Sequence, residues 1–377
     1  MERNLNEFRA LFPITKESIY FNHASTGPMS MPARRAIEEC IKVYQSQAEF
    51  DFDRYFGRLK EARSRIAKLI NATPDEITFT HSTSEGVYIA LINLPLKDGD
   101  KILVMKEVFP TVQYIVDYNL PGLEKKYVEF GGRDPIEVVK RNFDKKVRAV
   151  VIDWVQFFTG EVIDLNRLSK FLKEKGIYLV VDGIQGISAI EFNCLQTEVD
   201  FFACGAAKWL FGPSGAGFLY VNKKNFKFLR KLHTGWLGAD WHCWENFDFK
   251  QQKPLFTNAR MFEQGTRNII GISAFSENVK ILLQFGLKNV RKQISTVKEK
   301  LKVCAKELGF EILTPEIGLQ SGIITVRPRK NTHGYYDRLT KRRVIVSLRN
   351  NALRFSPHFY NTLEEVAEIR RIMQVTP

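Results

Sequence analysis

The sequence has few cysteines, and no two of them lie close together. Zinc motifs need two ligands within a few residues, as in CxxC, and disulfide-stapled proteins carry many closely spaced cysteines. The spacing therefore excludes a recognisable zinc motif and a disulfide framework, and no metal site is expected. The five cysteines of the 377 residues are Cys40, Cys194, Cys204, Cys243 and Cys304.

Long apolar runs are also missing. No stretch approaches the ~20 residues that a transmembrane helix needs, and no internal repeat is visible. The first residues, MERNLNEFRALFPITKES, mix charged and apolar side chains. They lack the basic-then-apolar order of a secretory leader. We therefore expect a cytoplasmic protein that makes no membrane contact.

Acidic residues are scarce relative to basic ones. The chain has 42 Asp and Glu against 56 Lys and Arg, a net charge of +14. Residues 327–354 contain nine Lys or Arg and a single acid, Asp337. Such a cluster can bind nucleic acid or attract anionic ligands, but no nucleic-acid-binding motif accompanies it. We interpret it as a solvated strand-and-loop region and do not expect nucleic acid as a partner. A non-catalytic polyanion-binding protein is the alternative from another functional class.

Apolar residues are abundant and form strands that alternate with helices. Hydrophobic residues make up 44% of the chain, which is enough for a sizeable core. Near-continuous apolar strands separated by helices are typical of an α/β fold with a mostly parallel sheet covered on both faces. The predicted strands are 77–80, 101–105, 147–155, 177–183, 199–205 and 215–221, with helices after residue 81 and at 167–176.

The C-terminal third has a different pattern. It predicts a helix at 295–309, short strands within 321–328, 343–349 and 352–357, and a last helix at 362–373. Thr362 and Glu365 form a capping box for this last helix. The pattern indicates a smaller α+β domain. The predicted organisation is an N-terminal segment 1–19 that packs near the small domain, a large domain 20–270 and a small C-terminal domain 271–377.

Three polar features follow predicted strands, and α/β sheets gather ligands at the carboxyl ends of their strands. Lys208, in CGAAKWLFGPSG, lies among small and apolar residues, although a lysine normally seeks water. Asp182 ends the strand YLVVD, and the turn HSTSEG at 81–86 opens a helix. A helix N-terminus favours an anion such as phosphate. Each feature is unspecific alone, because hydroxyls commonly cap helices and a lone carboxylate can cap a helix or bind a metal.

One ligand would use all three features together: pyridoxal phosphate. Its aldehyde reacts with a lysine amine, which becomes nucleophilic when desolvation lowers its pKa. A carboxylate keeps the pyridine nitrogen protonated, so that the ring withdraws electrons. The turn at the start of the helix would bind the phosphate. The sequence therefore predicts pyridoxal 5'-phosphate as the cofactor.

An ordered set of motifs spans nearly the whole chain. The motifs are YFNHASTGP (20–28), STSEG (82–86), EVFPT (107–111), VDGIQ (181–185), CGAAKWLFGPSG (204–215), FEQGTRN (262–268) and RFSPHFYNT (354–362). Each piece alone is unspecific, but the ordered set resembles the class V aminotransferase family of fold-type I pyridoxal phosphate enzymes. That group includes cysteine desulfurases, selenocysteine lyases and isopenicillin N epimerase-like proteins. The resemblance implies a fold-type I enzyme that acts on an amino acid.

The resemblance also implies a role for each matching residue. Lys208 matches the catalytic lysine, and Arg354 matches the arginine that binds the substrate's α-carboxylate. Thr266 matches a residue that reaches the phosphate from the other subunit, which implies a homodimer with composite active sites. The other matches are cofactor contacts: Asp182 for the pyridine nitrogen, Gln185 for the phenolic oxygen, Thr83 and Ser84 for the phosphate, Phe109 for stacking on the ring, and Gln156 for a polar approach to cofactor or substrate.

His23, in FNHASTGP, has two interpretations. The matching segment approaches the active site in relatives, so His23 could contact substrate or move a proton. It could equally be a histidine held by hydrogen bonds in a turn, because a candidate base needs demonstrated geometry.

The sequence departs from the desulfurases of this family at three places. Gly205, Ala206 and Ala207 precede the lysine where desulfurases have Ser-Gly-His, and Phe109 stands where they have a histidine. The segment 340–354 contains no cysteine. Sulfur transfer needs a thiolate there.

These departures favour a lyase that works by C–S or related β-elimination without a persulfide cysteine. A transaminase and an amino-acid epimerase remain alternatives on the same fold. A non-catalytic protein that keeps the fold is less consistent with the intact set of Lys208, Asp182 and Arg354.

Overall fold

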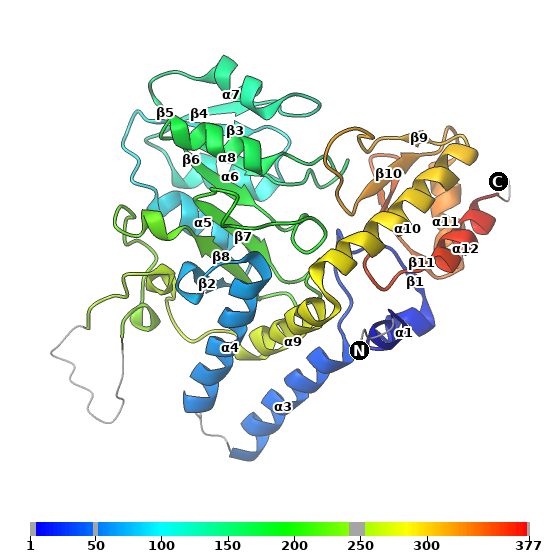
Figure 1. Ribbon diagram of the computed structural model, residues 1–377, viewed down its shortest axis with the longest axis horizontal. Coiled ribbons are helices and arrows are strands. Elements are labelled where there is room, and N and C mark those ends of the chain that lie inside the picture. The colour runs from blue at the N-terminus through cyan, green and yellow to red at the C-terminus, as the bar shows by residue number, and fades with distance from the viewer. Residues whose placement is uncertain (1–4, 48–51, 241–252, 375–377) are drawn as a thin grey trace.

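The computed structural model describes residues 5–47, 52–240 and 253–374. Figure 1 shows a larger unit built around a seven-stranded sheet and a smaller unit built around a four-stranded sheet. The predicted α/β fold class, with a mostly parallel large sheet and a smaller α+β part, is confirmed.

The large sheet has the strand order β2-β8-β7-β6-β5-β3-β4. The strands β4, β3, β5, β6 and β7 are mutually parallel, and β8 runs antiparallel to both of its neighbours. Most side chains of the central strands are buried, as expected for a sheet with helices on both faces. The strands are β2 (Ile77–Thr80), β3 (Lys101–Met105), β4 (Glu124–Val128), β5 (Val147–Asp153), β6 (Tyr178–Asp182), β7 (Phe201–Gly205) and β8 (Gly217–Val221).

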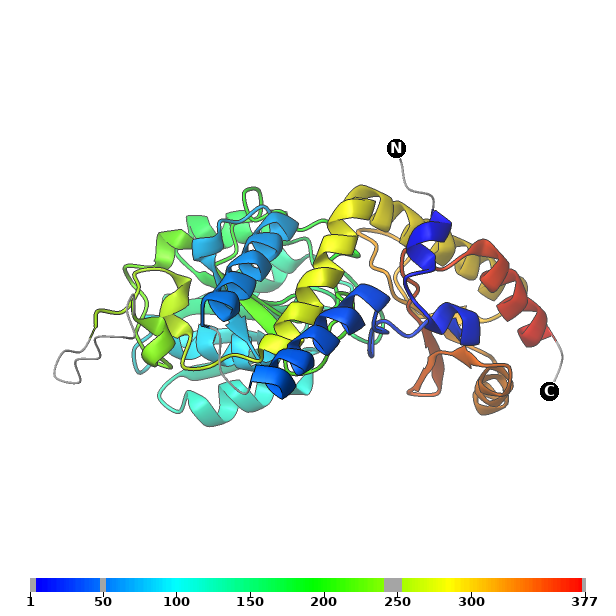
Figure 2. The same ribbon diagram turned by 90° about the horizontal axis from the view of Figure 1, so that it is seen from below.

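Helices connect the strands of the large sheet and cover it. Figure 2 shows α3, α4 and α9 side by side on one side of the large unit, and α9 contacts both of the others. The helices of the large unit are α3 (Met31–Gln47), α4 (Phe52–Ile70), α5 (Thr83–Asn93), α6 (Pro110–Asn119), α7 (Pro135–Asn142), α8 (Leu165–Glu174) and α9 (Ile269–Phe285), and short 3-10 turns lie at Pro74–Glu76, Lys223–Asn225, Trp236–Gly238 and Ala259–Phe262.

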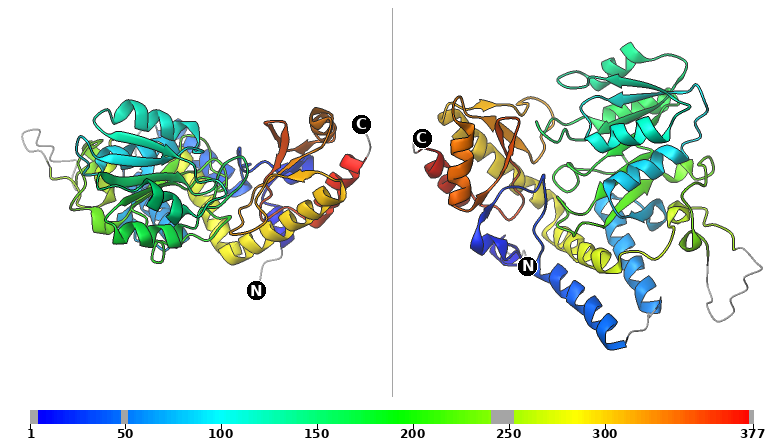
Figure 3. Two further views of the ribbon diagram at one scale, coloured as in Figure 1. Left: turned by 90° about the horizontal axis from the view of Figure 1, so that it is seen from above. Right: turned by 180° about the vertical axis from the view of Figure 1, so that it is seen from behind.

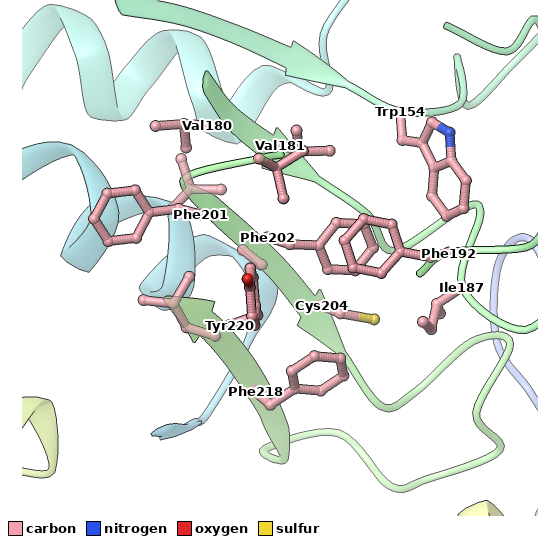
Figure 4. Close-up of a cluster of buried hydrophobic side chains, with 14 of the residues drawn as sticks. Trp154, Val180, Val181, Ile187, Phe192, Phe201, Phe202, Cys204, Phe218 and Tyr220 are labelled. Atoms are coloured by element: carbon pink, nitrogen blue, oxygen red, sulfur yellow. The ribbon is translucent and has the colours of Figure 1, made fainter. Parts of the chain in front are cut away.

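Aromatic side chains fill the core beneath the carboxyl ends of the central strands. The rings of Phe192 and Phe202 are stacked with centroids 4.1 Å apart, and Trp154 packs against both (Figure 4). Cys204 is fully buried in the same cluster. This dense layer gives the strand ends a rigid base, because protein interiors pack as tightly as organic crystals.

The small unit has its own hydrophobic cluster and a sheet of order β12-β13-β10-β9, with antiparallel neighbours. Figure 3 shows it beside the large unit, joined through α9 and α10, which meet at Gly286 with φ +88°. The predicted domain limits stay a prediction; α9 contacts helices of the large unit and α10 contacts elements of the small one. The elements are α10 (Leu287–Glu307), β9 (Glu311–Ile312), β10 (Ile324–Arg327), α11 (Thr332–Lys341), β12 (Ser347–Arg349), β13 (Ala352–Phe355) and α12 (Leu363–Gln374).

The N-terminal segment lies against the small unit. It contains α1 (Leu5–Arg9), α2 (Ile14–Glu17) and β1 (Ile19–Tyr20), and β1 pairs in parallel with β11 (Val344–Ile345). Arg9 forms an ion pair with Glu365 at 2.7 Å. The capping box predicted for the last helix is present, because the backbone N–H of Thr362 donates to Glu365.

The basic cluster 327–354 differs from the prediction of strands and loops. It contains the helix α11, which Asn331 caps by accepting the backbone N–H of Gly334 at 3.0 Å. The sequence signal is weak because a glycine lies in the first turn and few apolar residues mark a buried face. Arg327 is paired with Glu311 at 3.1 Å. Over the described ranges, no helix has both the length and the apolar character to cross a bilayer.

Candidate functional site

A cavity of about 260 Å³ lies at the carboxyl ends of β5, β6 and β7. Strand ends converge there because parallel strands terminate at the same edge of a sheet. The cavity walls are mostly apolar, and the polar groups in them come from segments far apart in the sequence. Its lining includes the predicted site residues Thr83, Ser84, Phe109, Asp182, Gln185 and Lys208.

Lys208 lies in a tight turn directly after β7. The turn is closed by a hydrogen bond from the backbone N–H of Phe211 to the carbonyl of Lys208 at 3.2 Å, and Phe211 has a positive φ of 54°. The N-terminal segment holds the turn from outside, because the N–H of Gly27 donates to the carbonyl of Ala207 at 2.7 Å. The lysine backbone is therefore fixed by two segments, while its side chain extends into the cavity.

The amine of Lys208 is in a desolvated environment. Burial lowers its pKa, the charge of Asp182 opposes this effect, and the charge of Arg354 adds to it. The amine lies 5.5 Å from the centre of the Phe109 ring. A lysine with a lowered pKa has more of its neutral, nucleophilic form at neutral pH.

Asp182 ends β6 and is almost entirely buried. Its Oδ1 accepts the backbone N–H of Ile184 at 3.0 Å. Burial raises the pKa of this carboxyl to about 6, although that hydrogen bond and the charge of Lys208 lower it. The group is therefore mainly ionised at neutral pH and presents a negative charge to the cavity.

The start of α5 offers an anion-binding wall. Ser82 caps the helix by accepting the N–H of Glu85 at 3.1 Å. Thr83 Oγ1 accepts the backbone N–H of Gly205 at 2.8 Å, and Ser84 accepts a hydrogen bond from Thr111 at 2.8 Å. The N-terminus of a helix carries partial positive charge and free N–H groups. The turn is thus tied to the end of β7 and oriented toward the same cavity as the lysine.

Gln185 lies in the cavity wall with both ends of its amide engaged. Its Nε2 donates to the carbonyl of Ala24 at 2.9 Å, and its Oε1 accepts the indole N–H of Trp209 at 3.0 Å. The second hydrogen on its Nε2 remains available to donate a hydrogen bond to a ligand. Phe109 is 43% exposed and packs edge-on against Phe157, so its ring face is accessible to a flat ligand.

Arg354 does not line the cavity itself, but it donates a hydrogen bond to Phe157, which does, and it is 1% exposed. Its guanidinium donates to the carbonyl of Phe157 and to the hydroxyl of Ser25 at 2.7 Å. Its Nε is buried and has no hydrogen-bond partner within residues 5–47, 52–240 and 253–374. Burial lowers its pKa to about 10, so it stays cationic at neutral pH. Among the described residues no carboxylate forms an ion pair with it, and a buried cation without a counter-charge favours an anionic ligand.

Besides Arg354, three predicted residues lie outside the cavity lining. His23 is fully buried, and its ring nitrogens contact the carbonyl of Ser356 at 2.8 Å and the hydroxyl of Tyr360 at 2.6 Å. Burial lowers the pKa of His23 to about 3, so it is neutral. This environment favours the second interpretation, a hydrogen-bonded structural histidine. Gln156 uses its amide oxygen to accept the N–H of residue 158 at 2.8 Å, and Thr266 is exposed.

Asp153 also lines the cavity, although no motif in the sequence marks it as a site residue. The predicted strand extended to residue 155, which placed this acid inside the strand. In the structure β5 ends at Asp153, so the acid lies at the strand end beside Asp182. The signal available was a single acidic residue in the apolar run VRAVVIDWV.

The groups in this cavity fit pyridoxal 5'-phosphate. They supply a desolvated amine for an aldehyde, a buried carboxylate for a pyridine nitrogen, a helix N-terminus for a phosphate and an accessible aromatic face. One buried polar atom beside the cavity, Arg354 Nε, has no hydrogen-bond partner among the described residues. Such atoms are rare in native structures and are consistent with a ligand that completes the site.

Comparison with known proteins places the chain in a family. The family model described as Aminotransferase class-V matches residues 19–369. An uncharacterized aminotransferase, YcbU, from Bacillus subtilis (strain 168) is 26% identical over 97% of this chain and 96% of the relative. A hercynylcysteine sulfoxide lyase from Schizosaccharomyces pombe (strain 972 / ATCC 24843) is 27% identical over 60% of each chain.

Solved structures share the fold. A complex between the cystine C-S lyase C-DES and its reaction product cysteine persulfide superposes with a TM-score of 0.88, at 20% identity, over 97% of this chain and 100% of that chain. The chain belongs to the class V aminotransferase family, whose enzymes use pyridoxal 5'-phosphate as their cofactor.

Proposed function

We propose that the protein is a pyridoxal 5'-phosphate-dependent lyase that cleaves a C–S or related bond at Cβ of an amino acid, without a persulfide on cysteine. One observation carries the proposal: a desolvated lysine lines the cavity, a buried arginine without a described carboxylate partner is hydrogen-bonded to the cavity residue Phe157, and no described cysteine lines the cavity. A relative named as a sulfoxide lyase supports the same reaction class.

Each proposed role follows from the position of the side chain. When bound, the cofactor supplies an aldehyde for the substrate's amine and a ring that withdraws electrons from Cα. Arg354 would bind the α-carboxylate and so orient the substrate against the ring. The amine of Lys208 would then remove the proton from Cα as the leaving group departs from Cβ. With water, the net products are pyruvate, ammonia and the released thiol.

Residues that line the cavity would hold the cofactor in place while the proton is removed from Cα. The start of α5, with Thr83 and Ser84, would bind the phosphate, and the N–H that Gln185 retains would reach the phenolic oxygen. Asp182 would hold the proton on the pyridine nitrogen, because it is buried and mainly ionised. Phe109 would cover one ring face. Its phenyl group cannot transfer a proton, which leaves that task to Lys208.

The cysteines do not resemble nucleophiles. Burial raises the pKa of Cys194 to about 11 and also raises those of Cys204 and Cys304. These thiols are therefore protonated at neutral pH, whereas a sulfur acceptor must be a thiolate. Cys40 is buried between helices, and Cys243 lies outside the described residues.

The first test locates the cofactor. The purified protein should be yellow, and borohydride should fix the cofactor on Lys208, as shown by mass spectrometry of peptides. The Lys208→Ala variant should lose this attachment. An unchanged spectrum and full activity in Lys208→Ala would refute the site.

The second test identifies the reaction. The protein is incubated with L-amino acids and S-substituted cysteines, and pyruvate, ammonia and sulfide or thiol are measured. The proposal expects pyruvate and ammonia in equal amounts with release of the thiol. Formation of a keto acid only when a second keto acid is present would identify a transaminase. Loss of chirality without net products would identify an epimerase.

We also propose a homodimer with composite active sites. Thr266 is exposed and lies outside the cavity of its own chain, which is consistent with action in the partner's site. Two-fold dimers are the commonest assembly. Mixing Lys208→Ala with Thr266→Ala subunits should restore part of the activity. A fully active monomer in light scattering would refute the dimer.

A further inference from the structure

Asp153 is a buried acid in the cavity that the proposed reaction does not use. It ends β5 as Asp182 ends β6, and the two residues are direct partners in the register of these parallel strands. Both line the cavity, so their side chains share one face of the sheet. Asp153 is 3% exposed and Asp182 is 5% exposed. Two carboxyl groups therefore lie side by side, out of water.

The two oxygens of Asp153 differ in their contacts. Oδ2 accepts the backbone N–H of Phe109 at 2.8 Å. Oδ1 is buried and has no hydrogen-bond partner in the part of the chain that the structure describes. An unpaired buried carboxylate oxygen would be costly, because it loses hydration and gains nothing in return. A proton on Oδ1 removes this cost and turns the atom into a donor.

The surrounding charges also favour one proton on this pair. Asp182 faces Asp153 from β6, Lys208 faces it from the turn after β7, and Phe109 contributes only its N–H from the turn after β3. Burial and then the charge of Asp182 raise the pKa of Asp153 well above its usual range, and they outweigh the opposing contacts. The pKa of Asp182 rises only to about 6. Adjacent carboxyl groups do not both ionise readily, so the proton belongs on Asp153.

We propose that Asp153 is a positioning residue for the cofactor: a neutral carboxylic acid that donates its Oδ1 hydrogen to the carboxylate of Asp182 while its Oδ2 holds the N–H of Phe109. The pair then carries a single negative charge, fixed on Asp182, which would pair with the ring nitrogen of the bound cofactor. The side chain of Asp153 would thus connect Phe109, which would cover the cofactor ring, to Asp182, which would pair with the ring nitrogen. The inference rests on the proposed contact between Asp182 and the ring nitrogen.

Substitutions can separate the protonated acid from other roles. Asp153→Asn keeps the shape, offers an amide N–H to Asp182 and an amide oxygen to Phe109, and cannot ionise. Asp153→Ala removes both hydrogen bonds. Asp200→Asn is the matched control, since Asp200 is a largely buried acid outside the cavity that accepts the N–H of Leu179 at 2.7 Å.

The first measurement needs no cofactor. Infrared spectra of the apoprotein at neutral pH should contain the carbonyl band of a protonated carboxylic acid. This band should be lost in Asp153→Asn and kept in Asp200→Asn. If Asp153→Asn and the wild type have the same band, Asp153 is ionised and the proposal is overturned. This result does not depend on which reaction the enzyme catalyses.

The second measurement is the affinity for pyridoxal 5'-phosphate, followed by absorbance. At neutral pH Asp153→Asn should bind within about threefold of the wild type, and Asp153→Ala roughly tenfold or more weakly, because it leaves the part-buried N–H of Phe109 without its acceptor and Asp182 without its donor. On raising the pH, the bound cofactor's spectrum should show in the wild type a transition, due to the ionisation of Asp153, that is missing in Asp153→Asn. Equal weakening in both variants, or identical pH titrations, would overturn the inference. Failure of the wild type to bind the cofactor would instead refute the proposed site.

Discussion

Substituting Gly27 by alanine tests whether the N-terminal segment fixes the turn that carries Lys208. A Cβ at position 27 would lie 2.1 Å from the carbonyl oxygen of Lys208 and 3.0 Å from the Cα of Phe211. Both neighbours are backbone atoms, so no side chain can rotate away. Gly27 cannot retreat either without losing the 2.7 Å hydrogen bond from its N–H to the carbonyl of Ala207. The added methyl group must therefore displace the lysine turn.

The expected loss of stability follows from the steric clash and from the lost hydrogen bond. Overpacking of a closely packed site costs about 1–3 kcal/mol, and loss of the hydrogen bond costs about 1 kcal/mol. We expect Gly27→Ala to lower the free energy of unfolding of the apoprotein by about 2–4 kcal/mol in urea titrations. Cofactor affinity should fall by roughly tenfold or more, since each ~1.4 kcal/mol of lost binding energy is a factor of ten.

A matched control separates this clash from a general effect of alanine. Gly57 lies within α4, and a Cβ there meets no atom within 4 Å. Because alanine favours the helix, Gly57→Ala should stabilise the protein by up to about 1 kcal/mol and leave cofactor affinity unchanged. If Gly27→Ala matches the wild type in both stability and cofactor affinity, the segment does not constrain the lysine turn and the argument fails.

Three further predictions concern charge and thiols. Arg354→Lys keeps a positive charge but loses the paired guanidinium contacts, so kcat/KM should fall by an amount equivalent to about 2–5 kcal/mol; an equal loss with a substrate analogue that lacks the α-carboxylate would contradict this role. A variant with all five cysteines changed to alanine or serine should retain near-normal turnover if folded, and a persulfide trapped on a wild-type cysteine would contradict the lyase mechanism. The pKa of Asp182 is raised to about 6 in the folded protein, so between about pH 4 and that value the folded state binds more protons than the unfolded chain. Stability from this group is therefore lost as the pH rises through that window, by on the order of 3 kcal/mol. Urea titrations of the apoprotein should show this loss for the wild type and a smaller one for Asp182→Asn, and parallel pH profiles would show that the group is not perturbed.

The strands of the large sheet were predictable because their signal is local. Apolar runs bounded by turns predicted β2, β3 and β6 to within a residue or two at each end. The sequence did not predict the helix α11, because this helix has no apolar face of its own and its few buried residues are covered by neighbouring elements. Only Leu339 and Thr332 of that helix are buried, which is too little to give a helical apolar period in the sequence.

The sequence by itself determined the chemistry of the site. Lys208, Asp182 and the hydroxyl-rich turn at 81–86 each follow a strand, and residues at strand ends meet at one edge of a parallel sheet whatever the details of packing. Their residue types are those that an aldehyde, a pyridine nitrogen and a phosphate require. The cofactor could therefore be inferred before any coordinates, and the resemblance of the ordered motifs indicated the family.

Only the tertiary structure decided which side chains are free to act. Register between β5 and β6 set Asp153 against Asp182, and no local pattern reports the register of two strands separated by a helix. In the folded chain, both ring nitrogens of His23 contact protein groups. The guanidinium of Arg354, by contrast, forms no ion pair with a carboxylate among the described residues, and its Nε has no hydrogen-bond partner there. The physical reason is that desolvation and hydrogen-bond pairing depend on all neighbours in space. Those neighbours come from segments hundreds of residues apart, such as the contact between Ser25 and Arg354.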